Sequence, residues 1–202
     1  NSKLSQGYDI HNDNMPREDY IIWQKSVLTE CMRLIKDDGA IFYNHKWRVQ
    51  KGLIEDCSDI VKDFPVRQII IWKKAGGINF KDTYFLPTYE VIYLIAKPKV
   101  KLVPKAKALT DVWSISQQIS PQNKNWHPAP FPLEIPERCI SSTYAKLVLD
   151  PFMGSGTTGK ACKKLNRTYI GFDISQDYCN KAIESINLFD VSTTLPPIIT
   201  SE

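Results

Sequence analysis

The sequence predicts an α/β fold, with a mostly parallel twisted sheet and helices on both of its faces. Apolar patterns typical of strands and helices alternate from residue 133 onwards, which is the arrangement that builds a parallel sheet. Two β-branched apolar runs precede them, and a glycine-rich stretch joins a strand to a helix at residues 147–164. A chain of 202 residues with 43% hydrophobic residues is long enough for one such core.

The N-terminal part is predicted to begin with a long helix and a short strand. Residues 1–14 are polar and rich in turn formers, so we expect a loop there. Apolar residues then recur with a period near 3.6 over residues 16–36, and Pro16 suits the first turn of the predicted helix. Residues 40–43 are typical of a buried strand, and residues 50–61 carry a weaker helical pattern.

Two strands and a basic segment follow. Residues 66–72 and 90–96 are β-branched and apolar, which predicts strands, and a loop rich in glycine and aromatic residues joins them. Residues 97–124 have the composition of an excursion from the core. Its first half carries lysines and no acid: Lys97, Lys99, Lys101, Lys105 and Lys107. The segment is either a solvated connection or a contact to nucleic-acid phosphates, and the sequence leaves both open.

The C-terminal part is predicted to repeat strand and helix. We expect helices at 133–143, 156–165 and 175–188, and strands at 146–149 and 168–172. The polar, proline-containing segment after residue 190 is expected to be a loosely held tail.

Composition narrows the class of protein. The net charge of +4 permits nucleic-acid binding without arguing for it. Five cysteines without a CxxC pair, and only three histidines, argue against a structural metal site. Scattered thiols in odd number suit a reducing cytoplasm, so we expect a cytoplasmic location. No apolar run of membrane-spanning length is present, so we expect no membrane partner.

The stretch GSGTTGK, residues 154–160, matches two nucleotide-binding motifs at once. Its glycines satisfy GxGxxG of dinucleotide-binding folds, and the same residues with the final lysine satisfy most of a phosphate-binding P-loop. A P-loop needs a hydroxyl after its lysine to ligate magnesium, and that position is Ala161. The P-loop is therefore rejected.

The position of Asp173 is compatible with two different ligands. It lies at the end of the next predicted strand, 17 residues after Gly156, where a ribose-binding carboxylate is expected. Any ligand with an adenosine ribose suits this arrangement. The glycines therefore do not choose between NAD and S-adenosylmethionine.

The residues around the glycines resemble a known family. Residues 150–158, DPFMGSGTT, closely resemble the DPFxGSGTT motif of DNA amino-methyltransferases, and residues 127–132, HPAPFP, resemble an element that lines the cofactor pocket of that family. The resemblance implies a Rossmann-like methyltransferase fold and S-adenosylmethionine as cofactor. It assigns cofactor binding to His127, Phe131, Pro132, Asp150, Phe152, Gly154, Ser155, Gly156, Thr157, Thr158 and Asp173.

Each of these residues also has a purely structural interpretation. Asp173 is a candidate N-cap of the helix that follows it, and His127 a candidate structural histidine. Phe131 and Phe152 are either core residues or pocket walls. The glycines serve a tight turn in any case, and the two threonines suit the first turn of a helix.

The order of motifs resembles the β class of the family, and the similarity covers most of residues 8–188. It implies a catalytic half at 1–96, a target-recognition segment at 97–124, a cofactor-binding half at 125–190 and a flexible tail at 191–202. The residues that this order places against DNA are Lys46, Trp47, Lys99, Lys101, Lys105 and Lys107. Phe80 is a further candidate for stacking on the target base.

The motif that activates the target amine is not found. The family uses (D/S/N)PP(Y/F/W), in which the polar group and a backbone carbonyl accept hydrogen bonds from the amine and the aromatic ring stacks on the flipped base. The only double proline, Pro196-Pro197, lacks polar and aromatic neighbours. In the β class the motif precedes the first long helix, so we expect it just upstream of Asn1, and the catalytic residues stay unknown.

The predicted activity is transfer of a methyl group from S-adenosylmethionine to an exocyclic amine of double-stranded DNA, with adenine N6 favoured over cytosine N4 on resemblance alone. A homodimer and a companion restriction endonuclease are further expectations. The alternative is a non-catalytic cofactor- or DNA-binding half that needs a partner carrying the missing motif. An NAD-dependent oxidoreductase is a third interpretation, which leaves the HPAPFP element unexplained.

Overall fold

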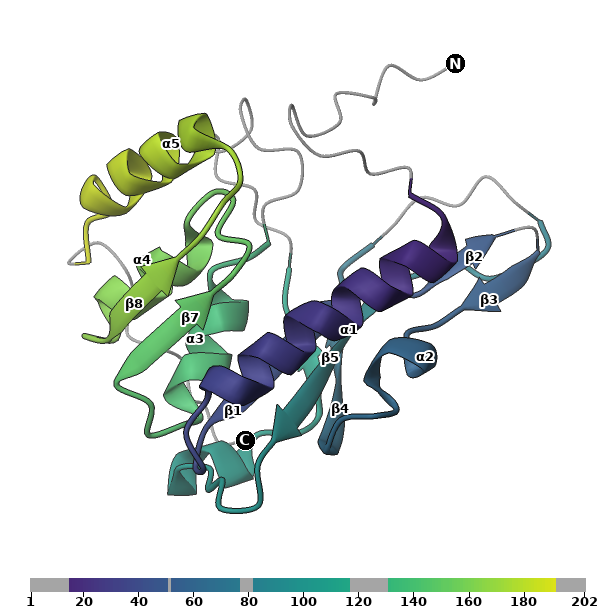
Figure 1. The fold of residues 1–202 in the computed structure, drawn as a ribbon, viewed down its shortest axis with the longest axis horizontal. Coiled ribbons are helices and arrows are strands. Elements are labelled where there is room, and N and C mark those ends of the chain that lie inside the picture. Colours follow the sequence, from purple (N-terminus) through teal and green to yellow (C-terminus); the bar gives the residue numbers. More distant parts are fainter. Residues whose placement is uncertain (1–14, 51, 77–81, 117–130, 192–202) are drawn as a thin grey trace. The chain divides into compact units, whose positions relative to one another are not determined.

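A computed structural model describes residues 15–50, 52–76, 82–116 and 131–191. They form two compact units, and each is described by itself. The N-terminal unit holds Met15–Lys101 and Leu109–Ser116, and the C-terminal unit holds Leu102–Ala108 and the described residues from 131 onwards. Figure 1 shows the elements of both units.

The N-terminal unit is built on a four-stranded mixed sheet. Its strands are β1 (Ala40–His45), β5 (Tyr89–Ala96), β4 (Val66–Lys73) and β6 (Val112–Ser114), in the order β1-β5-β4-β6. β5 runs antiparallel to both of its neighbours, and β6 runs parallel to β4. β1, β4 and β6 therefore point the same way, and their carboxyl ends share one edge of the sheet.

Helix α1 (Arg17–Leu34) covers one face of this sheet (Figure 1). It follows Pro16 and carries Glu18 and Asp19 in its first turn, where acids stabilise the helix dipole. Its buried Leu28 joins a core of side chains from β5, from α2 (Ser58–Val61) and from the residue before α2: Cys57, Ile60, Val61, Val91, Tyr93 and Ile95. Burial of these apolar side chains is what holds the helix on the sheet.

One predicted helix is wrong in its first half. A hairpin of β2 (Arg48–Gln50) and β3 (Leu53–Glu55) takes up the first half of residues 50–61, and only Ser58–Val61 is helical. Gly52 has φ = +81°, a conformation that turns the chain and that an α-helix does not contain. The predictions of the long helix and of the strands at 40–43, 66–72 and 90–96 are confirmed.

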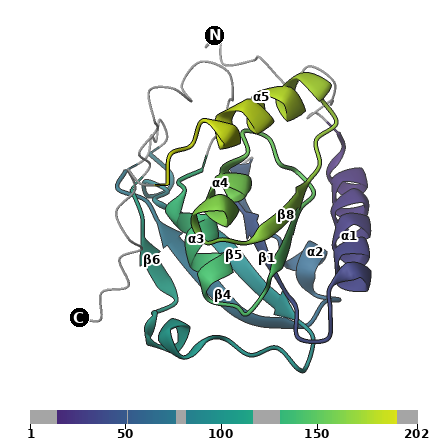
Figure 2. The ribbon, with the colours of Figure 1, turned by 90° about the vertical axis from the view of Figure 1, so that its left-hand side faces the viewer.

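The C-terminal unit matches the predicted alternation of strand and helix. It contains α3 (Glu134–Ser141), β7 (Leu147–Asp150), α4 (Thr157–Lys164), β8 (Thr168–Gly171) and α5 (Gln176–Asn187), after the short 3₁₀ helix η1 (Pro104–Ala108). β7 and β8 pair in parallel, and Figure 2 shows α4 beside β8. The α/β class is thus confirmed, with helices and strands alternating around a parallel pair.

Two expectations need correction, one about the sheet and one about the segment 97–124. The sheet is mixed rather than mostly parallel, because no helix crosses over between β4 and β5 in the described residues and such strands pair antiparallel. The segment 97–124 is not wholly an excursion either, since β6 belongs to the N-terminal sheet and Ala106 is buried in the C-terminal unit. The functional roles assigned to the four segments stay predictions.

Two polar contacts fix the helices of the C-terminal unit. The Lys163 ammonium donates hydrogen bonds to the carbonyls of Ile186, Asn187 and Phe189, and so satisfies the end of α5. Lys164 and Glu137 form an ion pair of 2.9 Å between α4 and α3, with 10% and 8% of the side chains exposed.

All five cysteines are free thiols. No helix in the described part of the chain has the length and apolar character to cross a membrane.

Candidate cofactor-binding site

The glycine loop connects the end of β7 to the start of α4 and is closed by the backbone. The Met153 N–H donates to the Phe172 carbonyl at 2.7 Å, and the Gly156 N–H donates to the Met153 carbonyl at 2.9 Å. Gly154 and Gly156 have φ of +47° and +76°, values at which a side chain is strained. A Cβ on Gly156 would also lie 2.9 Å from Ile186 Cδ1. Glycine at both positions is therefore a structural requirement of this turn.

Asp173 holds the loop from the end of β8. Its Oδ2 accepts the Gly154 N–H at 3.0 Å, and its Oδ1 accepts the Ser175 N–H at 2.9 Å. The N-cap of α5 is Ser175, whose hydroxyl accepts the Tyr178 N–H. The interpretation of Asp173 as that N-cap is therefore wrong. The carboxylate instead joins the glycine loop to the following turn.

Asp150 is the second carboxyl group at this end of the parallel pair. Its Oδ1 accepts the Phe152 N–H at 3.0 Å. Burial raises the pKa of Asp150 above its ordinary value, the hydrogen bonds from Thr158 and Phe152 oppose that shift, and the nearby Asp173 carboxylate adds to it. The side chain is thus a desolvated acid that hydrogen bonds hold in place.

The remaining residues predicted to bind the cofactor differ in how far their side chains are exposed. Ser155 and Thr157 are buried, and their hydroxyls share a hydrogen bond of 3.0 Å. Phe152 and Phe131 are 52% and 37% exposed, so neither is a core residue. Pro132 is buried just before α3. His127 lies outside the described residues, as do Phe80, residues 1–14 and the tail from residue 192.

The described DNA-binding candidates lie in both units. Lys46 is exposed directly after β1. Trp47 donates a hydrogen bond from Nε1 to the Tyr93 hydroxyl at 3.1 Å and packs edge-on against Tyr89, so it has a packing role. Lys99 pairs with Asp37 at 2.9 Å on the surface. Lys101, Lys105 and Lys107 are exposed.

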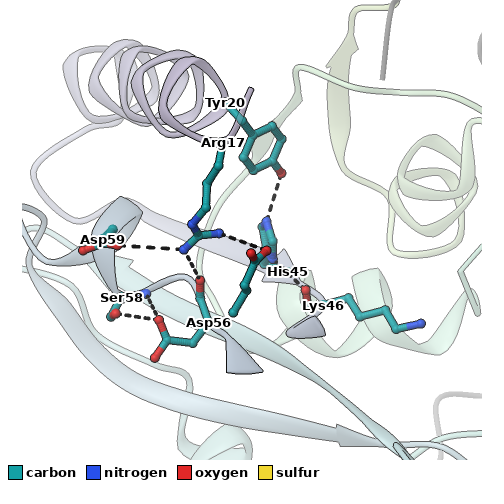
Figure 3. Close-up of polar contacts among 8 residues, drawn as sticks. Arg17, Tyr20, His45, Lys46, Asp56, Ser58 and Asp59 are labelled. Carbon is teal, nitrogen blue, oxygen red and sulfur yellow. Dashed lines mark hydrogen bonds and ion pairs between the residues drawn. The ribbon is translucent and has the colours of Figure 1, made fainter. Parts of the chain in front are cut away.

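One polar pair was missed by sequence reasoning. The Tyr20 hydroxyl lies 2.9 Å from His45 Nε2, and His45 Nδ1 lies 3.0 Å from the Lys46 carbonyl (Figure 3). A carbonyl only accepts, so Nδ1 carries the proton and Nε2 accepts from Tyr20. Burial lowers the pKa of His45, which favours this neutral form. The sequence carried no local signal for this pair, because Tyr20 and His45 lie 25 residues apart, on a helix and a strand.

A strand, a glycine turn, a helix and an acid after the next strand define an α/β domain that binds a nucleotide-like cofactor. Residues 2–184 match the N6/N4 DNA methylase family. The chain belongs to this family, which confirms the resemblance seen in residues 150–158.

Related proteins and structures agree with this family. The chain is 25% identical to the Type II methyltransferase M.BglII of Bacillus subtilis, over 91% of the chain and 62% of that protein. It is 29% identical to M.HpaI of Haemophilus parainfluenzae, over 91% of the chain and 65% of that protein. The chain thus spans less than two thirds of the length of these relatives.

Two solved structures share the fold. A complex of M1.HpyAVI with SAM aligns with a TM-score of 0.64 and 25% identity, over 86% of both chains. The cytosine-N4-specific PvuII DNA methyltransferase aligns with a TM-score of 0.76 over 94% of this chain and 77% of its own, at 18% identity. The second likeness establishes the fold alone. Together they confirm the methyltransferase fold that the sequence predicted.

Proposed function

We propose that the protein binds S-adenosylmethionine at the glycine loop and methylates an exocyclic amine of double-stranded DNA. The observation that carries the proposal is the Asp173 carboxylate. Each of its oxygens accepts one backbone N–H, from Gly154 or Ser175. An ionised carboxylate offers about four acceptor sites. Two therefore stay available for the two hydroxyls of a ribose, so holding the loop and binding the ribose are compatible.

The loop supports a ligand that approaches the backbone closely. Gly154, Ser155 and Gly156 are buried in a turn that opens at the end of β7. Phe152, half exposed beside this turn, supplies apolar surface for the adenine or the methionine chain. We assign the ribose to Asp173 and the methionine end to residues 152–158, with Phe131 and Pro132 as further wall residues. His127 completes this assignment.

Activation of the target amine requires a (D/S)PPY motif, and the described residues do not contain one. Because β1 pairs only with β5, and β7 only with β8, each has an edge without a partner among the described strands. A strand that carried the motif and paired at such an edge would complete the site. The non-catalytic half-enzyme is the alternative, and it differs by giving cofactor binding without methyl transfer. Adenine N6 is the proposed target, on family resemblance.

Calorimetry tests the cofactor. We expect S-adenosylmethionine to bind and NAD to give no signal, and binding of NAD alone would refute the proposal. Transfer of a labelled methyl group to unmethylated duplex DNA, followed by base analysis, tests the reaction. Methyladenine is the expected product; methylcytosine would correct the target, and cofactor binding without transfer would favour the half-enzyme. Sedimentation addresses the predicted homodimer, whereas the companion endonuclease stays a prediction.

A further inference from the structure

The β2–β3 hairpin extends the N-terminal unit at the edge where β1 ends. β1 closes with His45, and β2 begins at Arg48. The hairpin is a separate two-stranded sheet in the described chain. Such a ribbon is marginally stable on its own. This edge also collects the carboxyl ends of β4 and β6, and in α/β sheets ligands bind at the carboxyl ends of strands.

The hairpin exposes apolar side chains to solvent. Leu53 is 74% exposed, Ile54 61% and Val49 36%. Val49 lies directly opposite Ile54 in the register, so the two form a pair on one face, while Leu53 adjoins the turn at Gly52. Apolar side chains gathered on a short ribbon indicate a surface that another molecule covers.

The base of the hairpin is fixed by Arg17 of α1. Its guanidinium forms ion pairs with Glu55 at 3.5 Å and Asp59 at 3.8 Å, and it donates a hydrogen bond to the Asp56 carbonyl at 3.3 Å (Figure 3). The Asp56 carboxylate accepts bonds from the backbone and hydroxyl of Ser58. The acids at the base are therefore all engaged within the protein.

The cations of the same segment are not engaged in this way. Lys46 and Arg48 are exposed, and neither forms an ion pair with another described residue. Arg48 lies opposite Glu55 in the register, but Glu55 pairs with Arg17. The carbonyl of Lys46 accepts from His45, whose ring Tyr20 holds in turn. Two positive groups thus stand on a fixed turn beside an exposed apolar ribbon.

We propose that this hairpin is a DNA-contacting ribbon, in which Lys46 and Arg48 bind phosphates while the ribbon enters a groove with Leu53 on one face and Ile54 on the other. The proposal rests on the proposed function, because DNA is the substrate it assumes. A two-stranded ribbon fits the major groove, where apolar side chains contact the methyl group of thymine. The unpaired charges decide between occupants, since a second copy of the chain would bring the same cations face to face.

The electrostatic part is tested by the salt dependence of binding to a fluorescent 30-base-pair duplex. Each phosphate contact contributes about 0.9 to the slope of log K against log salt. The Lys46→Gln/Arg48→Gln double variant is expected to lower the magnitude of the slope by about 1.8. Lys36→Gln is the matched control, because Lys36 is exposed near the opposite edge of the sheet, and it should leave the slope unchanged. Equal slopes for the double variant and wild type would overturn the proposal.

The apolar part is tested with Leu53→Ser/Ile54→Ser. It is expected to weaken DNA binding by about tenfold at every salt concentration, with the slope retained. Leu34→Ser is its control, as Leu34 is 55% exposed at the far end of α1. Sedimentation without DNA completes the design. Loss of a dimer in this variant, with wild-type DNA affinity, would assign the hairpin to a second copy and overturn the proposal.

DNA binding by the wild-type chain distinguishes a failure of the hairpin proposal from a failure of the proposed function. A wild-type chain that binds no duplex at 50 mM salt would refute DNA as the substrate, and the hairpin proposal with it. A wild-type chain that binds duplex, with both hairpin variants unchanged, would refute the hairpin proposal alone.

Discussion

Replacing Asp173 separates the two tasks assigned to one carboxylate. In the free protein it accepts the N–H groups of Gly154 and Ser175, at 3.0 and 2.9 Å. Asp173→Ala removes both acceptors, and hydrogen bonds to a charged group contribute about 1.5–3 kcal/mol each when removed. Because the side chain is only half buried, we expect the lower end, about 3 kcal/mol of unfolding free energy in total.

In the proposed assignment of the ribose to Asp173, the same substitution also removes the acceptors of the ribose hydroxyls. Loss of the ribose contacts is expected to weaken S-adenosylmethionine by about 1–3 kcal/mol, or roughly 5- to 150-fold in Kd. Asp173→Asn keeps one oxygen but turns an amide towards the second N–H. It should therefore lose one bond of the pair and fall between Asp173→Ala and wild type in both measurements.

Urea unfolding without ligand and calorimetric titration with S-adenosylmethionine measure the two effects independently. Asp177→Asn is the control, because Asp177 lies on the first turn of α5 and pairs with Lys181 at 2.5 Å on the surface. If Asp173→Ala is destabilised yet binds cofactor as wild type does, the carboxylate only holds the loop. If neither quantity changes, the hydrogen bonds to Gly154 and Ser175 contribute nothing measurable, and both roles given to Asp173 are refuted.

Three further predictions concern the C-terminal unit. Gly159→Ala places a methyl group 2.4 Å from Ile186 Cδ1, so we expect a loss of about 1–3 kcal/mol in urea unfolding. Adding Ile186→Val should restore part of it, and no recovery would argue against this contact. Glu137→Gln leaves Lys164 buried and unpaired, at about 3–5 kcal/mol, whereas Glu137→Leu with Lys164→Met should unfold no more easily than wild type. Burial raises the pKa of Asp150, so its folded form holds the proton more tightly than the unfolded chain. Stability is then lost as pH rises above about 4, and Asp150→Asn should be more stable than wild type at pH 7.5, with a gain that shrinks towards pH 4.

The glycine loop was predictable because its determinants are local in sequence. Gly154 and Gly156 do adopt positive φ, and β7 and α4 flank them as expected. A turn of this kind depends on residues that adjoin it, so a motif of nine residues specifies it. Asp173 was also found, because parallel strands place successive carboxyl ends at one edge.

The hairpin was not predictable in the same way. Residues 50–61 carry apolar side chains at intervals that suit a helix, yet Leu53 and Ile54 are exposed. Their pattern does not reflect burial, and periodicity arguments assume that it does. The sheet order was missed for a related reason, because β1 pairs with β5 across four intervening elements of structure. Such a pairing depends on contacts far apart in the chain.

The carboxylates of Asp150 and Asp173 also indicate which sign of charge a ligand of the glycine loop should carry. Asp173 gains bonds from backbone N–H groups, whereas the charge of Asp150 is desolvated and lies near that of Asp173. A desolvated charge of this kind costs stability, and such costs are typical of functional sites. A pyrophosphate placed here would add negative charge to two carboxylates. S-adenosylmethionine carries a sulfonium and an ammonium group against one carboxylate, and this net positive charge would be stabilised by the two aspartates. Asp150→Asn should therefore be more stable than wild type and still bind S-adenosylmethionine more weakly, and a variant that gained in both respects would contradict this assignment of the ligand.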